Sequence, residues 1–240
     1  MEFSDFKTSL KEKLEKININ VNDTQVKKFY DYMNLLIKWN EKINLTAIIE
    51  PNDIILKHFI DSITIENSIK NDSKVIDVGT GAGFPGIPLS IIRNDLKISL
   101  MDSLNKRINF LDEVIKENCL NNVDTIHSRA EELGRNKDYR EQFDVATSRA
   151  VASLDVLLEY MLPFVKVGGY CICMKGSNID EELENSKKAL TLLNGKIENI
   201  IKFELPESDY GRNIIVVKKT ASTPGRYPRK PGTPSKEPIR

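Results

Sequence analysis

Short apolar runs alternate with amphipathic stretches through the middle of the chain, and this alternation constrains the fold more than any other feature of the sequence. The apolar runs have the length of β-strands, and the stretches between them have the spacing of amphipathic helices. Such alternation predicts parallel strands joined by crossover helices in a doubly wound α/β sheet. The runs are Lys74–Val78, Ile98–Met101, Val123–His127, Phe143–Thr147 and Tyr170–Met174, and the helical stretches lie near residues 86–93, 104–118, 153–164 and 179–193.

The first part of the chain has a helical pattern instead. Apolar residues recur on one face of residues 4–17 at intervals of three and four. A second helix is predicted to start at an N-cap, Asp23 or Thr24, and a third at Pro51, because proline suits the first turn of a helix. We therefore expect a helical layer before the sheet.

The last two strand-like segments depart from the alternation. Residues 196–205 and 213–219 are separated by only the seven residues PESDYGR. A connection this short demands an antiparallel pair. A mostly parallel sheet closed by an antiparallel C-terminal hairpin suggests the methyltransferase variant of the Rossmann architecture.

The charge of the chain is balanced in sum but uneven in distribution. Lys and Arg number 35, as do Asp and Glu, yet seven cations and one acid lie between Lys218 and Arg240, a net charge of +6 against −6 elsewhere. Residues 221–240 are proline-rich with few apolar side chains, so we expect them to be extended or disordered when free. The predicted organisation is a helical region at 1–70, a Rossmann-like methyltransferase domain at 71–220 and a basic tail at 221–240.

Composition excludes several other classes of protein. No stretch reaches 18 uninterrupted apolar residues, and the N-terminus lacks an apolar signal core, so we expect a cytoplasmic protein without a membrane partner. The three cysteines form no CxxC or Cys/His cluster, which argues against a metal site or a disulfide framework.

The sharpest motif is the sequence DVGTGAGFPGIP, which follows the first predicted strand at Asp77–Pro88. Its glycines allow unusual dihedral angles and a close approach of a ligand to the backbone. Asp102 ends the next strand, where a carboxylate can accept hydrogen bonds from ribose hydroxyls. The motif therefore predicts a nucleotide-type cofactor site. Its glycines are Gly79, Gly81, Gly83 and Gly86.

The choice of cofactor depends on the helix that follows this turn. A pyrophosphate needs free backbone N–H groups at a helix N-terminus, and Pro85 and Pro88 remove two of them. S-adenosylmethionine has no phosphate, and its sulfonium and amino groups tolerate a carboxylate such as Asp77. S-adenosylmethionine is therefore favoured, and NAD stays as the alternative.

Further candidate residues follow the later strands, since ligands in such sheets gather at the carboxyl ends of strands. Glu131 and Glu132 follow the third strand, where the adenine edge of a cofactor would be expected, and Arg149 follows the fourth. His58 and Asp61 lie three residues apart on the proposed third helix, and we interpret them as a structural pair that joins the helical layer to the sheet.

Cations in three places are candidates for contacts with a polyanionic partner such as RNA. Arg107 opens the helix after Asp102, and Lys175 follows the fifth strand at the mouth of the predicted pocket. The tail adds Arg226, Arg229 and Lys230, whose extended backbone could follow a phosphate chain. Removal of the tail should then weaken RNA binding and flatten its salt dependence.

The order of these motifs resembles the RsmG (GidB) family of bacterial methyltransferases that act on 16S ribosomal RNA. The resemblance covers nearly the whole chain, and although the glycine turn occurs in many methyltransferases, the ordered series is specific to the family. The matching motifs are WNEKINLT (Trp39–Thr46), HFIDS (His58–Ser62), DVGTGAGFPGIPLSI (Asp77–Ile91), MDSLNKRINFL (Met101–Leu111), SRAEEL (Ser128–Leu133), SRAVASL (Ser148–Leu154), MKG (Met174–Gly176) and TPGRYPRKPGTPSKEP (Thr223–Pro238).

The resemblance implies methylation of guanine N7 in 16S rRNA, free or in a small-subunit precursor, by a monomer that uses S-adenosylmethionine. Guanine N7 carries no proton, so the reaction needs no general base, and we name no catalytic residue. The family's cofactor contacts fall on Gly79, Phe84, Ala130, Glu131 and Arg149. Together with the residues argued above, the predicted cofactor contacts are Asp77, Gly79, Gly81, Phe84, Asp102, Ala130, Glu131 and Arg149.

Two other classes of function stay open on the residues alone. A methyltransferase acting on a protein or small molecule would not need the basic tail. An NAD-dependent oxidoreductase or a non-catalytic nucleotide-binding module would bind NAD rather than S-adenosylmethionine.

Overall fold

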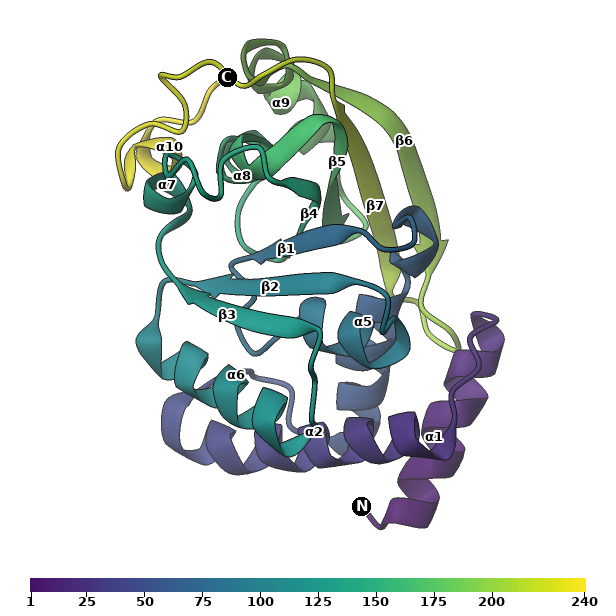
Figure 1. Ribbon diagram of the computed structural model, residues 1–240. Helices are drawn as coiled ribbons and strands as arrows, with labels where there is room; N and C mark the ends of the chain where they lie inside the picture. The colour runs from purple at the N-terminus through teal and green to yellow at the C-terminus, as the bar shows by residue number, and fades with distance from the viewer.

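A seven-stranded sheet forms the centre of the protein in the computed structural model, which describes residues 1–240 (Figure 1). The strand order is β3-β2-β1-β4-β5-β7-β6, and only β7 runs antiparallel to its neighbours. The predicted doubly wound sheet with an antiparallel C-terminal hairpin is therefore confirmed. The strands are β1 (Lys74–Val78), β2 (Lys97–Asp102), β3 (Val123–His127), β4 (Phe143–Arg149), β5 (Val165–Lys175), β6 (Gly195–Glu204) and β7 (Gly211–Lys219).

Helices cover both faces of the sheet and bury two separate apolar cores (Figure 1). Side chains alternate between the faces along each strand, so that Val75 packs into one core and Ile76 into the other. No helix is long and apolar enough to cross a membrane. One layer contains α1 (Phe3–Lys16), α2 (Asp23–Ile43), α5 (Gly86–Ile92) and α6 (Asn105–Glu117), and the other contains α7 (Ala130–Leu133), α8 (Leu154–Met161) and α9 (Asp180–Leu193).

The N-terminal helices pack onto the layer formed by α5 and α6. Asn22 caps α2 in a capping box with Gln25, so the cap lies one residue before the earlier of the two predicted positions. Trp39 packs against Phe110 of α6 with ring centroids 5.7 Å apart. The hydroxyl of Tyr32 donates to the carbonyl of Ala82, which ties α2 directly to the glycine turn.

The predicted third helix is not one continuous α-helix. A short α3 (Pro51–Asp53) leads into a π-helix, η1 (Ile54–Ile60), and then into α4 (Asp61–Ile63). π-helical turns are rare and are frequently found at functional sites. Here η1 carries Lys57 and His58 to the end of β4, as described below.

The structure corrects the expectation that residues 221–240 are extended or disordered. This tail packs over α7 and α8, includes the short helix α10 (Thr233–Lys236), and buries Tyr227 and Ile239 in the core beneath it (Figure 1). The side chain of Arg140 donates to three backbone carbonyls of the tail. The tail therefore has a packed position on the body of the protein.

Buried acids on α8 explain why the tail docks. Glu159 is fully buried and accepts hydrogen bonds from the backbone and guanidinium of Arg229, with the shortest contact at 2.7 Å. Asp155, also buried, accepts from Arg240 at 2.8 Å. The composition of the tail shows that it is basic and poor in apolar residues. It does not show that the tail's arginines pair with Glu159 and Asp155, two buried carboxylates 70 and 85 residues earlier in the chain.

Candidate functional site

A cavity of about 430 Å³ lies at the carboxyl ends of β1, β2 and β4. Sites for small ligands in proteins typically have volumes of ~300–1,000 Å³, so the cavity is large enough for a cofactor. It lies where the sequence predicts the cofactor site, at the edge of the sheet where parallel strands end. Its lining residues are Leu45, Thr46, His58, Gly79–Ala82, Phe84, Asp102, Ser103, Arg107 and Arg149–Val151.

The glycine turn after β1 forms one wall of this cavity with bare backbone. Gly79, Gly81 and Gly83 all have positive φ, which favours glycine. A Cβ atom on Gly81 would meet no other atom within 4 Å, so this position opens onto free space, whereas one on Gly79 would lie 2.8 Å from Val151. The turn therefore leaves room for a ligand to approach the main chain closely.

Asp77 lies beneath the turn and does not line the cavity. Its Oδ2 accepts hydrogen bonds from the hydroxyl of Thr80 at 2.7 Å and from the backbone N–H of Gly86 at 2.9 Å, while Oδ1 has no partner. Burial raises the pKa of Asp77 to about 7. The contacts of this carboxyl group hold the shape of the turn.

Asp102 places a carboxylate inside the cavity at the end of β2. Its Oδ2 accepts from the backbone N–H of Gly81 at 3.0 Å and from Arg107 at 3.1 Å, and Oδ1 accepts from the backbone of Leu104 at 2.9 Å. A carboxylate has about four acceptor sites, so it can still accept a hydroxyl proton. Arg107, a predicted RNA contact, is thus placed in this cavity as the partner of Asp102.

Arg149 ends β4 and is held by three groups from the helical layer. It donates to the backbone carbonyl of Lys57 at 2.8 Å, to Asp61 at 3.0 Å and to Nδ1 of His58 at 3.0 Å. The guanidinium carbon lies 4.8 Å from the ring centroid of Phe84. The predicted role of His58 and Asp61, joining the helical layer to the sheet, is therefore confirmed.

His58 is neutral in this arrangement. Burial, and then the neighbouring Arg149 guanidinium, lower its pKa to about 3. Arginine can only donate, so Nδ1 is the acceptor and Nε2 carries the proton, which it donates to the hydroxyl of Thr46 at 2.9 Å. The imidazole also stacks on Phe84 at 4.3 Å. His58 thus orients Arg149 and Phe84 and has no free nitrogen for proton transfer.

Ala130 and Glu131, two further predicted cofactor contacts, begin α7 after β3 and do not line the cavity. Both are buried. The Glu131 side chain accepts a hydrogen bond from the backbone N–H of Gly232 at 2.8 Å, so it faces the tail.

A second cavity, of about 740 Å³, adjoins the first and shares its walls at His58 and Arg149–Val151. Lys57, Tyr210, Arg212 and Lys175 contribute to its remaining lining. The two cavities thus lie side by side along the carboxyl edge of the sheet.

The predicted RNA contacts outside the first cavity have different surroundings. Lys175 is nearly buried and bonds to Glu182 at 2.6 Å, and Arg229 is bound to Glu159. Arg226 and Lys230 are exposed on the docked tail. Only these last two present free cations.

Sequence reasoning missed Tyr210 and Arg212. Both lie in or next to the short connection between β6 and β7, whose length predicts only that the two strands are antiparallel. Because β7 inserts between β5 and β6, the start of β7 comes to the same edge of the sheet as the end of β5. Arg212 there donates to Asp61 at 3.0 Å.

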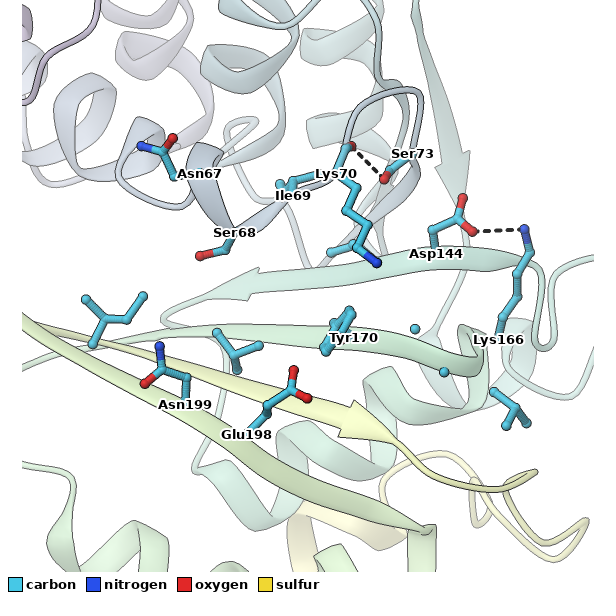
Figure 2. Close-up of a pocket in the computed structure, with 16 residues that line it drawn as sticks. Asn67, Ser68, Ile69, Lys70, Ser73, Asp144, Lys166, Tyr170, Glu198 and Asn199 are labelled. Atoms are coloured by element: carbon cyan, nitrogen blue, oxygen red, sulfur yellow. Dashed lines mark hydrogen bonds and ion pairs between the residues drawn. The ribbon is translucent and has the colours of Figure 1, made fainter.

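A larger cavity, of about 820 Å³, lies elsewhere (Figure 2). It is lined by the early residues of β4 and β5, including Tyr170, and by residues of β6 and β7, so it faces the amino ends of the parallel strands. Lys166 and Asp144 on its rim pair with each other at 3.0 Å and are both substantially exposed. Nothing converges on a ligand position there, and the smaller cavity is the better candidate site.

The sheet order and the glycine turn define the fold of S-adenosylmethionine-dependent methyltransferases. The chain is similar to a solved SAM-dependent methyltransferase from Aquifex aeolicus, with a TM-score of 0.54 and 18% identity over 72% of this chain and 96% of that one. It is also similar to Aeropyrum pernix fibrillarin, solved with bound S-adenosyl-L-methionine, with a TM-score of 0.50 and 16% identity over 62% and 67% of the two chains. These likenesses support the fold class.

Sequence comparison identifies the family within that class. The family model for GidB, rRNA small subunit methyltransferase G, matches residues 25–211. The chain is 58% identical to the ribosomal RNA small subunit methyltransferase G of Acetivibrio thermocellus, over 92% of this chain and 91% of that one. It is 51% identical to the protein of the same name from Alkaliphilus oremlandii, over 98% and 100%. The chain belongs to the rRNA small subunit methyltransferase G family, as its motifs predicted.

Proposed function

We propose that this chain transfers a methyl group from S-adenosylmethionine to N7 of a guanine in 16S rRNA, free or in a precursor of the small ribosomal subunit. Membership of the family supports an rRNA substrate. The observation that carries the proposal is the pair of adjoining cavities at the carboxyl edge, with Arg149 and His58 on their common wall. We further propose that the enzyme is a cytoplasmic monomer.

The first cavity fits the cofactor. Gly81 leaves the main chain open to a ligand, and Asp102 supplies acceptors for ribose hydroxyls. Phe84 offers an apolar ring beside the turn. We keep the start of α7, at Ala130 and Glu131, as a proposed contact through its backbone, because the Glu131 side chain is engaged with the tail.

The residues on the shared wall are suited to alignment rather than to proton transfer. When bound, S-adenosylmethionine supplies a methyl group on a positively charged sulfur, and the C–S bond breaks with its electrons left on sulfur as the N7–C bond forms. No proton moves, because N7 of neutral guanine carries none. His58 has a pKa of about 3 and both nitrogens engaged, so it holds Arg149 and Phe84 in place. Most of the rate would then come from proximity and orientation.

A transfer assay tests the proposal. Labelled S-adenosylmethionine is incubated with the enzyme and with small-subunit particles or rRNA from cells that lack it, and the labelled base is mapped. We expect 7-methylguanine at one position. Binding of S-adenosylmethionine without any label in the RNA would reject an RNA substrate, and label on another atom would reject the N7 assignment.

The exposed cations of the tail have a separate test. Deletion of residues 221–240 would strand Glu159 without its partner, so substitution is the cleaner experiment. We expect Arg226→Ala with Lys230→Ala to weaken RNA binding and to reduce the salt slope by about one to two counterions. Lys188→Ala, an exposed cation on α9, is the control. If the salt dependence of RNA binding is the same as in wild type, the tail does not contact the RNA.

A further inference from the structure

An exposed aromatic ring lies between two cations at the mouth of the second cavity. Tyr210, in the connection from β6 to β7, is 44% exposed. The Lys57 ammonium lies 4.8 Å from the ring centroid, and the guanidinium carbon of Arg212 lies 6.0 Å from it. Each cation also pairs with an acid, Lys57 with Asp53 at 3.0 Å and Arg212 with Asp61 at 3.0 Å, and these pairs hold both cations beside the exposed ring.

The ring and its cations are fixed relative to the cofactor cavity. Asp61 is buried and accepts from Arg149 at 3.0 Å through one carboxylate oxygen and from Arg212 at 3.0 Å through the other. The backbone carbonyl of Lys57 binds Arg149 as well. One hydrogen-bond network therefore fixes the position of the second cavity's rim relative to the wall of the cofactor cavity.

The chemistry of the rim matches a nucleotide. A purine taken out of its stack needs an aromatic face to replace the lost stacking, and its flanking phosphates need cations. In the free protein the Lys57 ammonium lies over the ring and pairs with Asp53 at 3.0 Å. A phosphate beside it would be a further charged partner, stronger than the ring face, and would draw the ammonium off the ring. The ring face is then available to a base.

We propose that Tyr210 is the stacking platform for the target guanine and that Lys57 and Arg212 bind the phosphates beside it. This inference rests on the proposed function, because it assumes that the acceptor is guanine N7. Methylation at N7 makes the base a cation, and a cation is attracted to the negative face of an aromatic ring. The interaction therefore strengthens along the reaction, and such an interaction accelerates the chemical step.

Kinetics of Tyr210 variants test the platform. We expect Tyr210→Ala to lower kcat/KM for the RNA by about 10- to 100-fold, with part of the loss in kcat, and Tyr210→Phe to stay within about threefold of wild type. The dissociation constant for S-adenosylmethionine should change by less than about twofold in both. The matched control is Tyr170→Phe and Tyr170→Ala, since Tyr170 also lies beneath a lysine, Lys218 at 5.9 Å, but faces the other end of the sheet. A kcat/KM for Tyr210→Ala within twofold of wild type would overturn the proposal.

Product mimics distinguish stacking on the π face of Tyr210 from contact with any apolar side chain of similar size. We expect 7-methylguanosine monophosphate to inhibit the wild-type enzyme about fivefold more strongly than guanosine monophosphate, because only the methylated base is cationic. Tyr210→Leu keeps an apolar side chain without a π face, and it should bring this ratio close to one. Equal inhibition by the two nucleotides in wild type, or an unchanged ratio in Tyr210→Leu, would contradict the inference. A wild-type enzyme that labels no RNA would instead reject the proposed function, while the inhibition ratio would still report on the ring.

Discussion

The two edges of the sheet carry similar components, and only one edge is assembled as a site. Each edge has a cavity, a glycine with positive φ that faces open space, a carboxylate and a tyrosine beneath a lysine. Both carboxylates accept backbone hydrogen bonds, but the one at the carboxyl edge is buried, whereas the one at the amino edge is exposed and pairs with an exposed lysine. Because the cavity at the amino edge is larger than the candidate cofactor cavity, size alone does not identify the site. The distinguishing feature is a buried, oriented charge beside open backbone. The corresponding residues are Gly81, Asp102 and Tyr210 at the carboxyl edge and Gly168, Asp144 and Tyr170 at the amino edge.

The largest contrast is expected between the two open glycines. A leucine at Gly81 would project into the cofactor cavity, and we expect Gly81→Leu to weaken S-adenosylmethionine binding by about 1,000-fold in calorimetric titration. Gly168→Leu suffers the same left-handed strain, about 1 kcal/mol of stability, but should leave cofactor affinity unchanged. Equal loss of cofactor affinity in both variants would show that backbone strain, and not obstruction of the cavity, weakens S-adenosylmethionine binding.

The second contrast concerns the pH dependence of stability. Burial raises the pKa of Asp77 to about 7 from an ordinary value of 3.8, so the folded state holds its proton more tightly than the unfolded state. Wild type should therefore lose free energy of unfolding, relative to Asp77→Asn, as pH rises from about 4 to about 7. The loss should be on the order of a few kcal/mol, since each pKa unit corresponds to about 1.4 kcal/mol. Urea denaturation at intervals across this range measures it, and a constant difference would contradict a protonated Asp77.

The third contrast compares the carboxylates that line the two cavities. Asp102→Asn removes the negative charge that accepts hydrogen bonds from the Gly81 N–H and from Arg107. We expect this variant to bind the cofactor about tenfold more weakly. Asp144→Asn should change cofactor binding by less than about twofold. Calorimetric titration of both variants decides the matter, and comparable losses would weaken the distinction between the edges.

The smallest effect is expected for the stability contribution of Asp144. Partial burial alone would raise the pKa of this carboxyl, but hydrogen bonds from the Lys74 backbone and from Lys166 lower it below its ordinary value. Its contribution should be present above about pH 4 and should be lost as pH falls further, opposite in sign to Asp77. Because the pair is exposed, we expect Asp144→Asn to cost less than about 1 kcal/mol at pH 7. A larger loss of unfolding free energy in urea denaturation would show that the Asp144–Lys166 pair contributes more than an exposed ion pair does.

Local patterns predicted the parts of this molecule that depend on neighbours in sequence. Periodicity gave the strands and the hairpin, and the glycine motif gave the turn and the position of Asp102 at the end of the next strand. The position of Arg149 in the candidate cavity was predictable because carboxyl ends of parallel strands meet at one edge. Each of these inferences needs only a short stretch of chain or a rule of topology.

The remaining features depend on contacts between distant residues. Asp61 binds Arg149 and Arg212, which are 88 and 151 residues away, and no local signal marks such a partner. The π-helix has the same apolar pattern in its sequence as an ordinary helix, so the sequence does not distinguish the two. Its distinguishing contact is with a distant residue, because the Lys57 carbonyl binds Arg149. The docked tail was missed for the same reason, because its cations pair with acids on α8.

The pairing of α8 with the tail has a consequence for the order of events during synthesis. Glu159 leaves the ribosome 70 residues before Arg229, so a growing chain contains α8 long before it contains the cation that neutralises it. An unpaired carboxylate resists burial, and this face of the sheet cannot close at full stability until the tail has emerged. Folding of nascent chains generally proceeds from the N-terminus. The helical layer and the glycine turn can therefore pack early, while a chain stalled before residue 229 would carry an open, charged face that chaperones and proteases can recognise.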